Sequence, residues 1–126
     1  MPTFYKIDKE RRLILSSGSG TFSLADAMGH QKKLPADLDF DPSFSQIADF
    51  RHVTQFDISV NDVQKLAEKS IFSAESRRAF IMPNEVGFGL ARMFEILRAN
   101  VGEEKIGVFR DLEAALDWIL SKNDDS

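Results

Sequence analysis

Two patterns of apolar and polar residues follow one another along the chain, one typical of strands and one typical of helices. Short runs rich in β-branched, aromatic and other apolar residues occupy 3–8, 12–17, 45–50, 77–82 and 105–109. Between and after these runs, apolar residues recur every three or four positions, which is the spacing of one face of a helix. Only three residues separate the first two runs, and this short gap is typical of a hairpin. The pattern therefore predicts the order β-β-α-β-α-β-α-β-α.

Capping and stop signals frame the helical segments. The pairs Ser23 with Asp26 and Ser59 with Asp62 have the spacing of a capping box, with Asp at the position that usually holds Glu or Gln. Further signals are Pro35 as the stop of the first helix, Asn84 and Asp111 as N-caps of the third and fourth, and Gly102 as the stop of the third. The sequence Gly18-Ser19-Gly20 predicts a bend, a bulge or a close backbone approach.

Each predicted helix presents an apolar face to the sheet. In the first helix this face holds Leu24, Met28, Gln31 and Leu34. In the second it holds Val60, Val63, Leu66 and Ala67, with Glu68 and Lys69 on the opposite side. The longest helix, from Asn84 to Val101, has an apolar stripe of Val86, Leu90, Met93, Phe94, Leu97 and Val101.

Strands that alternate with helices favour an α/β fold, and right-handed crossovers make the later strands parallel. The N-terminal hairpin adds an antiparallel pair, so we predict a mixed sheet of about five strands flanked by about four helices. The length of 126 residues fits a single domain over 1–121, with 122–126 as a polar C-terminal tail.

Composition and charge argue against several classes of partner and chemistry. The net charge is −4, and Lys and Arg are interleaved with acids, which argues against a nucleic-acid partner. Cysteine is absent, so disulfides and thiolate chemistry are excluded. The N-terminus has no apolar signal core, and no run approaches the ~18 apolar residues of a membrane span. We therefore expect a cytoplasmic protein without a membrane partner.

No metal or catalytic motif is present. His30 is expected on the polar face of the first helix and His52 in the loop after the third strand, neither at ligand spacing from a second His. Asp49 followed by Arg51 predicts a local ion pair or a cap of the following turn. Without a Cys nucleophile, paired carboxylates or a metal motif, we expect no cofactor, no metal and no enzymatic activity.

The ordered combination of elements resembles a STAS domain, the fold of the bacterial anti-sigma-factor antagonists, over nearly the whole chain. The stretches that carry this resemblance are FDPSFSQIADFRHVTQFDIS, RRAFIMPNEVGFGLARMFEIL and VFRDLEAALDWI. More narrowly, the chain resembles small bacterial STAS-like proteins of unassigned function. The resemblance implies a regulatory, protein-binding module.

In that family an Asp-Ser-Ser-Gly type turn carries a serine that a kinase-type partner phosphorylates. Here the turn is Asp57-Ile58-Ser59-Val60, in which Asp57 and Ser59 match the pattern and the other two depart from it. The resemblance thus implies Ser59 as a phosphoacceptor. The residues themselves predict that the Ser59 hydroxyl caps the helix that follows. The two roles are compatible.

Two functions from different classes follow. The first is binding of another protein, or of a second copy of this chain, through the exposed helix ends, with Asp57, Ser59, Asn84, Phe88 and Arg92 as contacts. Phe88 either anchors such an interface beside Arg92 or completes the core. The alternative is a carrier or sensor of an anionic or amphipathic small molecule, held at the carboxyl ends of the strands by His52, Asn84 and Arg110.

Overall fold

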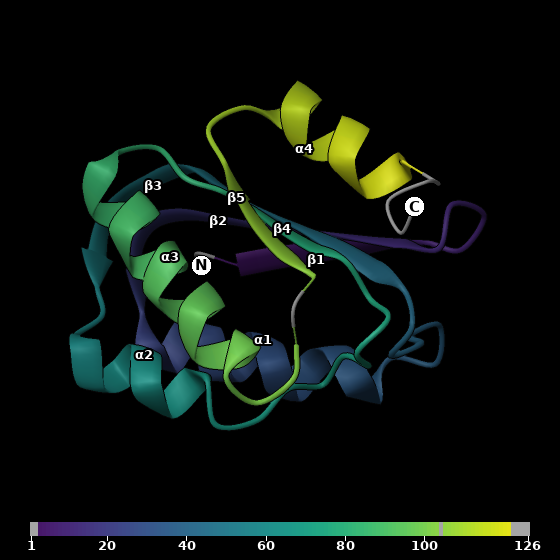
Figure 1. Ribbon diagram of the computed structural model, residues 1–126, viewed down its shortest axis with the longest axis horizontal. Helices are drawn as coiled ribbons and strands as arrows, with labels where there is room; N and C mark the ends of the chain where they lie inside the picture. Colours follow the sequence, from purple (N-terminus) through teal and green to yellow (C-terminus); the bar gives the residue numbers. More distant parts are fainter. Residues whose placement is uncertain (1–2, 104, 122–126) are drawn as a thin grey trace.

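The computed structural model, which describes residues 3–103 and 105–121, contains one five-stranded sheet and four helices (Figure 1). In chain order the elements are β1 (Thr3–Asp8), β2 (Leu13–Ser23), α1 (Leu24–Ala36), β3 (Ser45–Asp57), α2 (Val60–Leu66), β4 (Arg78–Ile81), α3 (Glu85–Ala99), β5 (Ile106–Phe109) and α4 (Leu112–Leu120). The strands follow one another across the sheet as β1-β2-β3-β4-β5. The β1–β2 pair is antiparallel and the other pairs are parallel, so the predicted α/β fold with a mixed sheet is confirmed.

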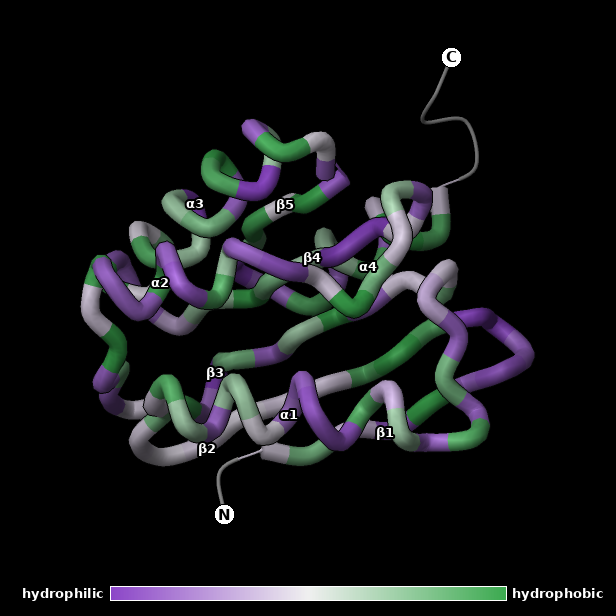
Figure 2. The backbone as a smooth tube through the Cα atoms, turned by 90° about the horizontal axis from the view of Figure 1, so that it is seen from below, coloured by the Kyte–Doolittle hydropathy of each residue, from purple (hydrophilic) through white to green (hydrophobic). Residues whose placement is uncertain are grey.

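The helices cover the two faces of the sheet unequally. α4 packs on β3, β4 and β5 and lies above the sheet in Figure 1, whereas α1 and α2 lie below it and α2 packs against α3. Hydrophobic residues concentrate in the strands between these layers (Figure 2). The face under α4 is filled by a cluster that includes Leu13, Ile47, Ile81 and Ile119. The other face carries two further clusters, one centred on Phe80 and one on Leu34.

β2 and β3 are much longer than their apolar runs predict. The pairing of β2 with β3 continues through Gly18-Ser19-Gly20 because the register shifts between Ser17 and Ser19 and again between Gly20 and Thr21. Gly20 has φ +67°, a conformation that glycine adopts without strain. At each shift the extra residue lies on β3, so the irregularity is in β3 opposite the glycines, while Gly18-Ser19-Gly20 remains part of β2. The prediction that His52 lies in a loop is wrong, since His52 pairs with Ser19 inside the sheet and its side chain is exposed.

All four predicted N-caps are confirmed. The hydroxyls of Ser23 and Ser59 each accept a hydrogen bond from the backbone N–H three residues later. In return, the carboxylates of Asp26 and Asp62 each accept one from the backbone N–H of the capping serine. The side chains of Asn84 and Asp111 accept from the N–H groups of Gly87 and Ala114. The predicted ends are less accurate: α1 runs one residue past Pro35, and α2 ends at Leu66, before Glu68 and Lys69.

The buried face of α3 differs from the predicted stripe. Gly87, Ala91 and Arg98 are buried, whereas Val86 and Val101 are 66% and 65% exposed. Leu90 and Phe94 of the predicted stripe do line the space between α3 and the sheet, so the prediction is right in the middle of the helix and wrong for Val86 and Val101 at its two ends. Small residues are needed here because a Cβ on Gly87 would lie 2.8 Å from the Phe56 ring.

Similar shifts affect the shorter helices. Val60, at the first turn of α2, is 53% exposed, whereas Val63 and Ala67 are buried as predicted. In α1, Met28 is 46% exposed. His30 points toward the sheet, contrary to its predicted place on the polar face, and contacts Tyr5 edge to face.

Candidate functional site

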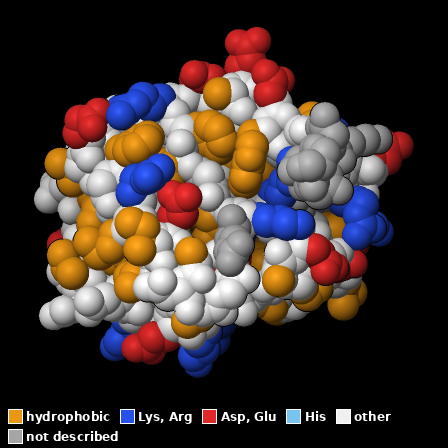
Figure 3. Space-filling view, in the orientation of Figure 1, with side chains coloured by type: hydrophobic (Ala, Val, Ile, Leu, Met, Phe, Trp, Pro, Cys, Tyr) orange, Lys and Arg blue, Asp and Glu red, His pale blue; other side chains and the backbone are white. Residues whose placement is uncertain are grey.

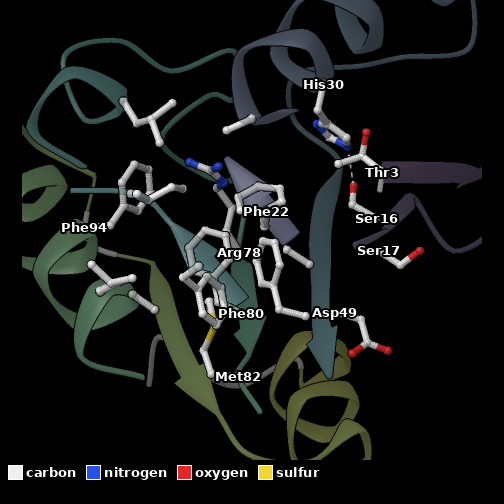
Figure 4. Close-up of a pocket in the computed structure, with 18 of the residues that line it drawn as sticks. Thr3, Ser16, Ser17, Phe22, His30, Asp49, Arg78, Phe80, Met82 and Phe94 are labelled. Atoms are coloured by element: carbon white, nitrogen blue, oxygen red, sulfur yellow. Dashed lines mark hydrogen bonds between the residues drawn. The ribbon is translucent and has the colours of Figure 1, made fainter. Parts of the chain in front are cut away.

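A cavity of about 140 Å³ lies between the sheet and the three helices α1, α2 and α3; we call it the helix-side cavity (Figure 4). Most of its lining is apolar. The apolar lining residues are Phe22, Ala27, Ala48, Phe50, Phe56, Ile58, Val63, Leu66, Phe80, Met82, Leu90, Ala91 and Phe94. Much of this wall comes from five of the chain's 11 Phe residues. The cavity exists because these rings meet the small side chains of Ala27, Ala48 and Ala91, which leave space between them.

A chain of hydrogen bonds joins four polar side chains of the cavity wall. Arg78 Nε donates to Gln46 Oε1 at 3.2 Å, and Gln46 Nε2 donates to Ser16 Oγ at 3.0 Å. Ser16 Oγ in turn lies 2.9 Å from His30 Nε2 (Figure 4). Each partner fixes the next: the guanidinium sets the orientation of the Gln46 amide, whose N–H then occupies an acceptor site of Ser16. Ser16 therefore has its own hydrogen to donate to His30, which fits a neutral ring protonated at Nδ1.

The Arg78 end of this chain belongs to a buried charge cluster. Arg78 Nη1 donates to Glu103 Oε2 at 3.3 Å, and Arg98 Nε donates to Glu103 Oε1 at 2.7 Å. Arg98 Nη1 also donates to the carbonyl of Ala67 at 2.8 Å. All three charged residues are at most 9% exposed. Two guanidinium groups thus share one carboxylate, and the cluster carries a net charge of +1.

Aromatic rings surround the Arg78 guanidinium. Its Cζ lies 4.6 Å from the ring centroid of Phe72, 5.4 Å from that of Phe80 and 5.5 Å from that of Phe94. Ring faces attract a cation and exclude water from it, so they compensate part of the cost of burial. Burial nevertheless lowers the pKa of Arg78 from its usual value, against the opposing effect of Glu103.

The pKa of His30 is also lowered from its ordinary value of 6.5. Burial is the largest cause, followed by the positive charges of Arg78 and Lys33. Below pH 6.5 the unfolded chain then binds more protons at this residue than the folded chain. The stability of the fold must therefore decrease as the pH falls from 6.5 toward the lowered pKa of the folded state.

We expect this loss to depend on His30. The free energy of unfolding should be measured by urea denaturation between about pH 7 and pH 5, above the range in which carboxylates titrate. The wild type should lose stability toward the acidic end, and His30→Gln should remove most of that loss. His52→Gln, which changes the chain's other histidine on the exposed side of β3, is the matched control and should keep the slope. Equal slopes in wild type and His30→Gln would contradict the assignment.

The residues predicted for ligand binding at the strand ends do not line the cavity. Arg110 pairs with Glu85 at 2.6 Å, and the side chain of Asn84 caps α3. Among the described residues, no hydrogen bond or ion pair links His52 to either of them. Their predicted role as a shared ligand site remains a prediction.

The residues predicted for partner binding lie at or near the surface. Asp57, Ser59, Asn84 and Arg92 are exposed, and Arg92 lies 3.6 Å from Glu95. Phe88 is half-buried against the Phe80 cluster, and the guanidinium of Arg110 stacks on its ring at 4.2 Å. Phe88 thus contributes to the core, and its predicted role at an interface remains untested.

Ser59 is an exposed N-cap. Its Oγ accepts from the N–H of Asp62 at 3.1 Å, and Asp62 Oδ2 accepts from the N–H of Ser59 at 3.0 Å. We expect Ser59→Ala to lower the free energy of unfolding by about 1 kcal/mol, because the N–H of Asp62 loses its acceptor. Ser59→Asn, which can cap equally well, should cost a few tenths of that or nothing. Chemical denaturation of the three proteins compares them, and an Ala variant as stable as wild type would rule out the capping role.

The side chains that line the polar wall were missed by the sequence analysis. Ser16, Gln46 and Arg78 come from β2, β3 and β4, and His30 comes from α1. One signal was available: polar residues at 16, 46 and 78 interrupt runs that otherwise read as buried strands, and buried polar groups need partners. Their mutual contact could not be inferred, since it depends on the register between strands far apart in sequence.

Metal and membrane features are absent from the described part of the chain. Within 3–103 and 105–121, no three His, Asp or Glu side chains gather into a group that could hold a metal ion. None of the helices in these ranges combines the length and the apolar character needed to cross a bilayer.

Comparison with known proteins supports the fold. The sequence matches no protein-family model and no curated protein. Among solved structures, the structure of the chain is similar to that of an uncharacterized protein of the DUF3478 family with a SpoIIAA-like fold from Shewanella loihica PV-4. The TM-score is 0.61 at 18% sequence identity, and the match covers 94% of this chain and 93% of that one. The chain therefore has a SpoIIAA-like α/β fold, in agreement with the α/β order of elements that the sequence predicts.

Proposed function

We propose that the chain is a non-enzymatic binding module that holds a small, mainly apolar molecule in the helix-side cavity. The observation that supports this proposal is the cavity itself: about 140 Å³ of space walled by phenylalanine and aliphatic side chains. An apolar cavity of about 150 Å³ is large enough to bind benzene or xenon. A single ring or a short branched chain is therefore the size of ligand that fits.

Binding explains the site better than catalysis does. Ser16 and His30 are within hydrogen-bond distance, but the Ser16 oxygen already accepts from Gln46. Among the described residues no carboxylate bonds to the His30 ring to orient it, as the third member of a catalytic triad would. The polar chain therefore shapes and stiffens the wall of a binding site.

The proposal is tested by filling the cavity. Ala27→Leu adds three carbon atoms to a side chain of α1 that lines the cavity, and Ala25→Leu adds them to an exposed position two residues earlier on the same helix. Ligand-observed NMR with toluene should show saturable binding to the wild type and to Ala25→Leu, and strongly reduced binding to Ala27→Leu. Toluene binding that is absent from the wild type, or unaffected by Ala27→Leu, would refute the proposal.

A second candidate is a protein-binding module of the kind that the resemblance to STAS domains implies. It is favoured by apolar side chains that α3 exposes, with Val86 66% and Ile96 57% exposed, and hydrophobic groups are visible on this face in Figure 3. Self-association would bury them. Native mass spectrometry of the isolated protein tests this candidate: a dimer that Ile96→Lys dissociates supports it, and a monomer for wild type counts against the homodimer.

A regulatory role for Ser59 belongs to this second candidate. Phosphorylation would add a group to an exposed helix N-terminus beside Asp57 and Asp62. Mass spectrometry after incubation with cell extract and ATP would reveal a phosphate on Ser59. Its persistent absence would leave Ser59 as a cap alone.

A further inference from the structure

The helix-side cavity has one charged group available to a ligand. Arg78 is 7% exposed and lines the cavity, and its Nε and Nη1 are engaged by Gln46 and Glu103. Its third nitrogen, Nη2, has no acceptor among the described residues. Nη2 is not among the fully buried side-chain atoms that lack a partner, so it keeps some accessible surface, and a ligand in the cavity can accept a hydrogen bond from it. In Figure 4 Arg78 is surrounded by Phe22, Phe80 and Phe94.

The charge balance around Arg78 is also incomplete. Among the described residues, Glu103 is the one carboxylate that pairs with Arg78 and Arg98, which leaves one positive charge of this buried cluster without a described counter-charge. The other carboxylate near the cavity, Asp49, is already bound by Arg51 through hydrogen bonds of 2.7 and 2.9 Å. His30, facing the same space, is held toward its neutral form, since its pKa is lowered. The cavity therefore lacks one negative charge.

From these two observations we propose that the ligand is a monocarboxylate with a compact apolar body, and that its carboxylate accepts a hydrogen bond from Arg78 Nη2. This inference rests on the proposed binding function and deepens it. A carboxylate matches the planar guanidinium and brings a single charge, whereas a dianionic phosphate would exceed the charge available. The apolar body fills the space between the phenylalanine rings and the alanines of α1, β3 and α3.

The expected preference can be measured with benzoate, benzamide and benzylamine. The three share a ring that fits the cavity and differ in charge: negative, neutral and positive. Charged hydrogen bonds contribute more than neutral ones, so benzoate should bind at least about tenfold more tightly than benzamide near pH 7. Benzylamine should bind more weakly than either. Isothermal titration calorimetry provides the dissociation constants.

The hydrogen bond between the ligand and Arg78 can be detected separately by NMR. In ¹⁵N-labelled protein, the guanidinium signal of Arg78 should shift on addition of benzoate and move little with benzamide. Arg78→Met, which keeps length and apolar contact, should lose the preference for benzoate and still bind toluene. Arg92→Met changes an exposed arginine of α3 and is the matched control, with the preference retained. If Arg78→Met does not fold, the ¹⁵N shift and the affinity ratio in wild type still decide.

The outcomes separate this inference from the broader function. Equal affinity for benzoate and benzamide, with both abolished by Ala27→Leu, would overturn the carboxylate assignment and leave a neutral-ligand module. Absence of binding by all the ring compounds, toluene included, would overturn the proposed function as well. A tenfold or larger preference for benzoate that disappears in Arg78→Met would establish both.

Discussion

Replacing Glu103 by alanine is expected to lower the free energy of unfolding by about 3–5 kcal/mol, because it strands two buried cations. Glu103 is 4% exposed and accepts from Arg78 and Arg98, and no other carboxylate among the described residues bonds to either of them. The cost comes mainly from leaving these charges in a medium of low polarity, beyond the loss of two hydrogen bonds. Urea denaturation monitored by circular dichroism measures the change.

Two control variants identify the mechanism of this loss. Glu75→Ala removes an exposed carboxylate from the loop before β4 and should change stability by less than about 0.5 kcal/mol. Adding Arg98→Met to Glu103→Ala removes one of the stranded cations, so the double variant should recover part of the lost stability. A free energy of unfolding of Glu103→Ala within about 1 kcal/mol of the wild-type value would show that the cluster is solvated. The cavity would then not lack a negative charge.

Leu34→Ala is the second change with a large expected effect, a loss of about 2–5 kcal/mol. Leu34 is fully buried near the C-terminal end of α1, in a cluster with Ile14, Phe44 and Phe72. Truncation removes apolar burial and leaves a void, because the surrounding phenylalanine rings cannot all move into it. The same denaturation experiment gives the magnitude.

The chain offers a matched control four residues away. Leu38 is completely exposed in the segment after α1, so Leu38→Ala should change the free energy of unfolding by no more than about 0.5 kcal/mol. Similar losses at both positions would mean that α1 does not pack on the sheet as described. The cavity, which α1 helps to enclose, would then lose one of its walls.

The sequence predicted the order of the elements and their starting points well, and for a local reason. A capping serine such as Ser59 and its acidic partner three residues later act on the backbone between them, so the signal is complete within one turn. The hairpin of β1 and β2 and the parallel strands that follow come from the same kind of local pattern. The similar solved structure agrees with this fold over 94% of the chain.

What the sequence could not provide were features that depend on distant neighbours. β3 extends to Asp57 because β2 continues beside it across two register shifts, so the pairing overrides the polar composition of 51–57. α3 buries Gly87 and exposes Val86 because the Phe56 ring occupies the space against that helix. Hydropathy alone predicts the opposite, with Val86 buried and Gly87 exposed.

The candidate site was missed for the same reason. Ser16, Gln46 and Arg78 stand 30 and 32 positions apart in sequence and meet only through the strand register. The predicted site residues were instead polar groups near helix starts, such as Asn84 and Ser59, whose side chains satisfy the backbone. Caps and ligand contacts draw on similar residue types, so position in the sequence does not distinguish them.

Diffraction from a crystal of the protein pressurised with xenon tests the helix-side cavity most directly. Xenon enters apolar voids of this size and is located by its own scattering. We expect a strong xenon peak between β3 and α3, bounded by Phe80, Phe94 and Ala48, that is lost in Ala27→Leu. A wild-type crystal with no peak there, in which side chains fill the space, would contradict it.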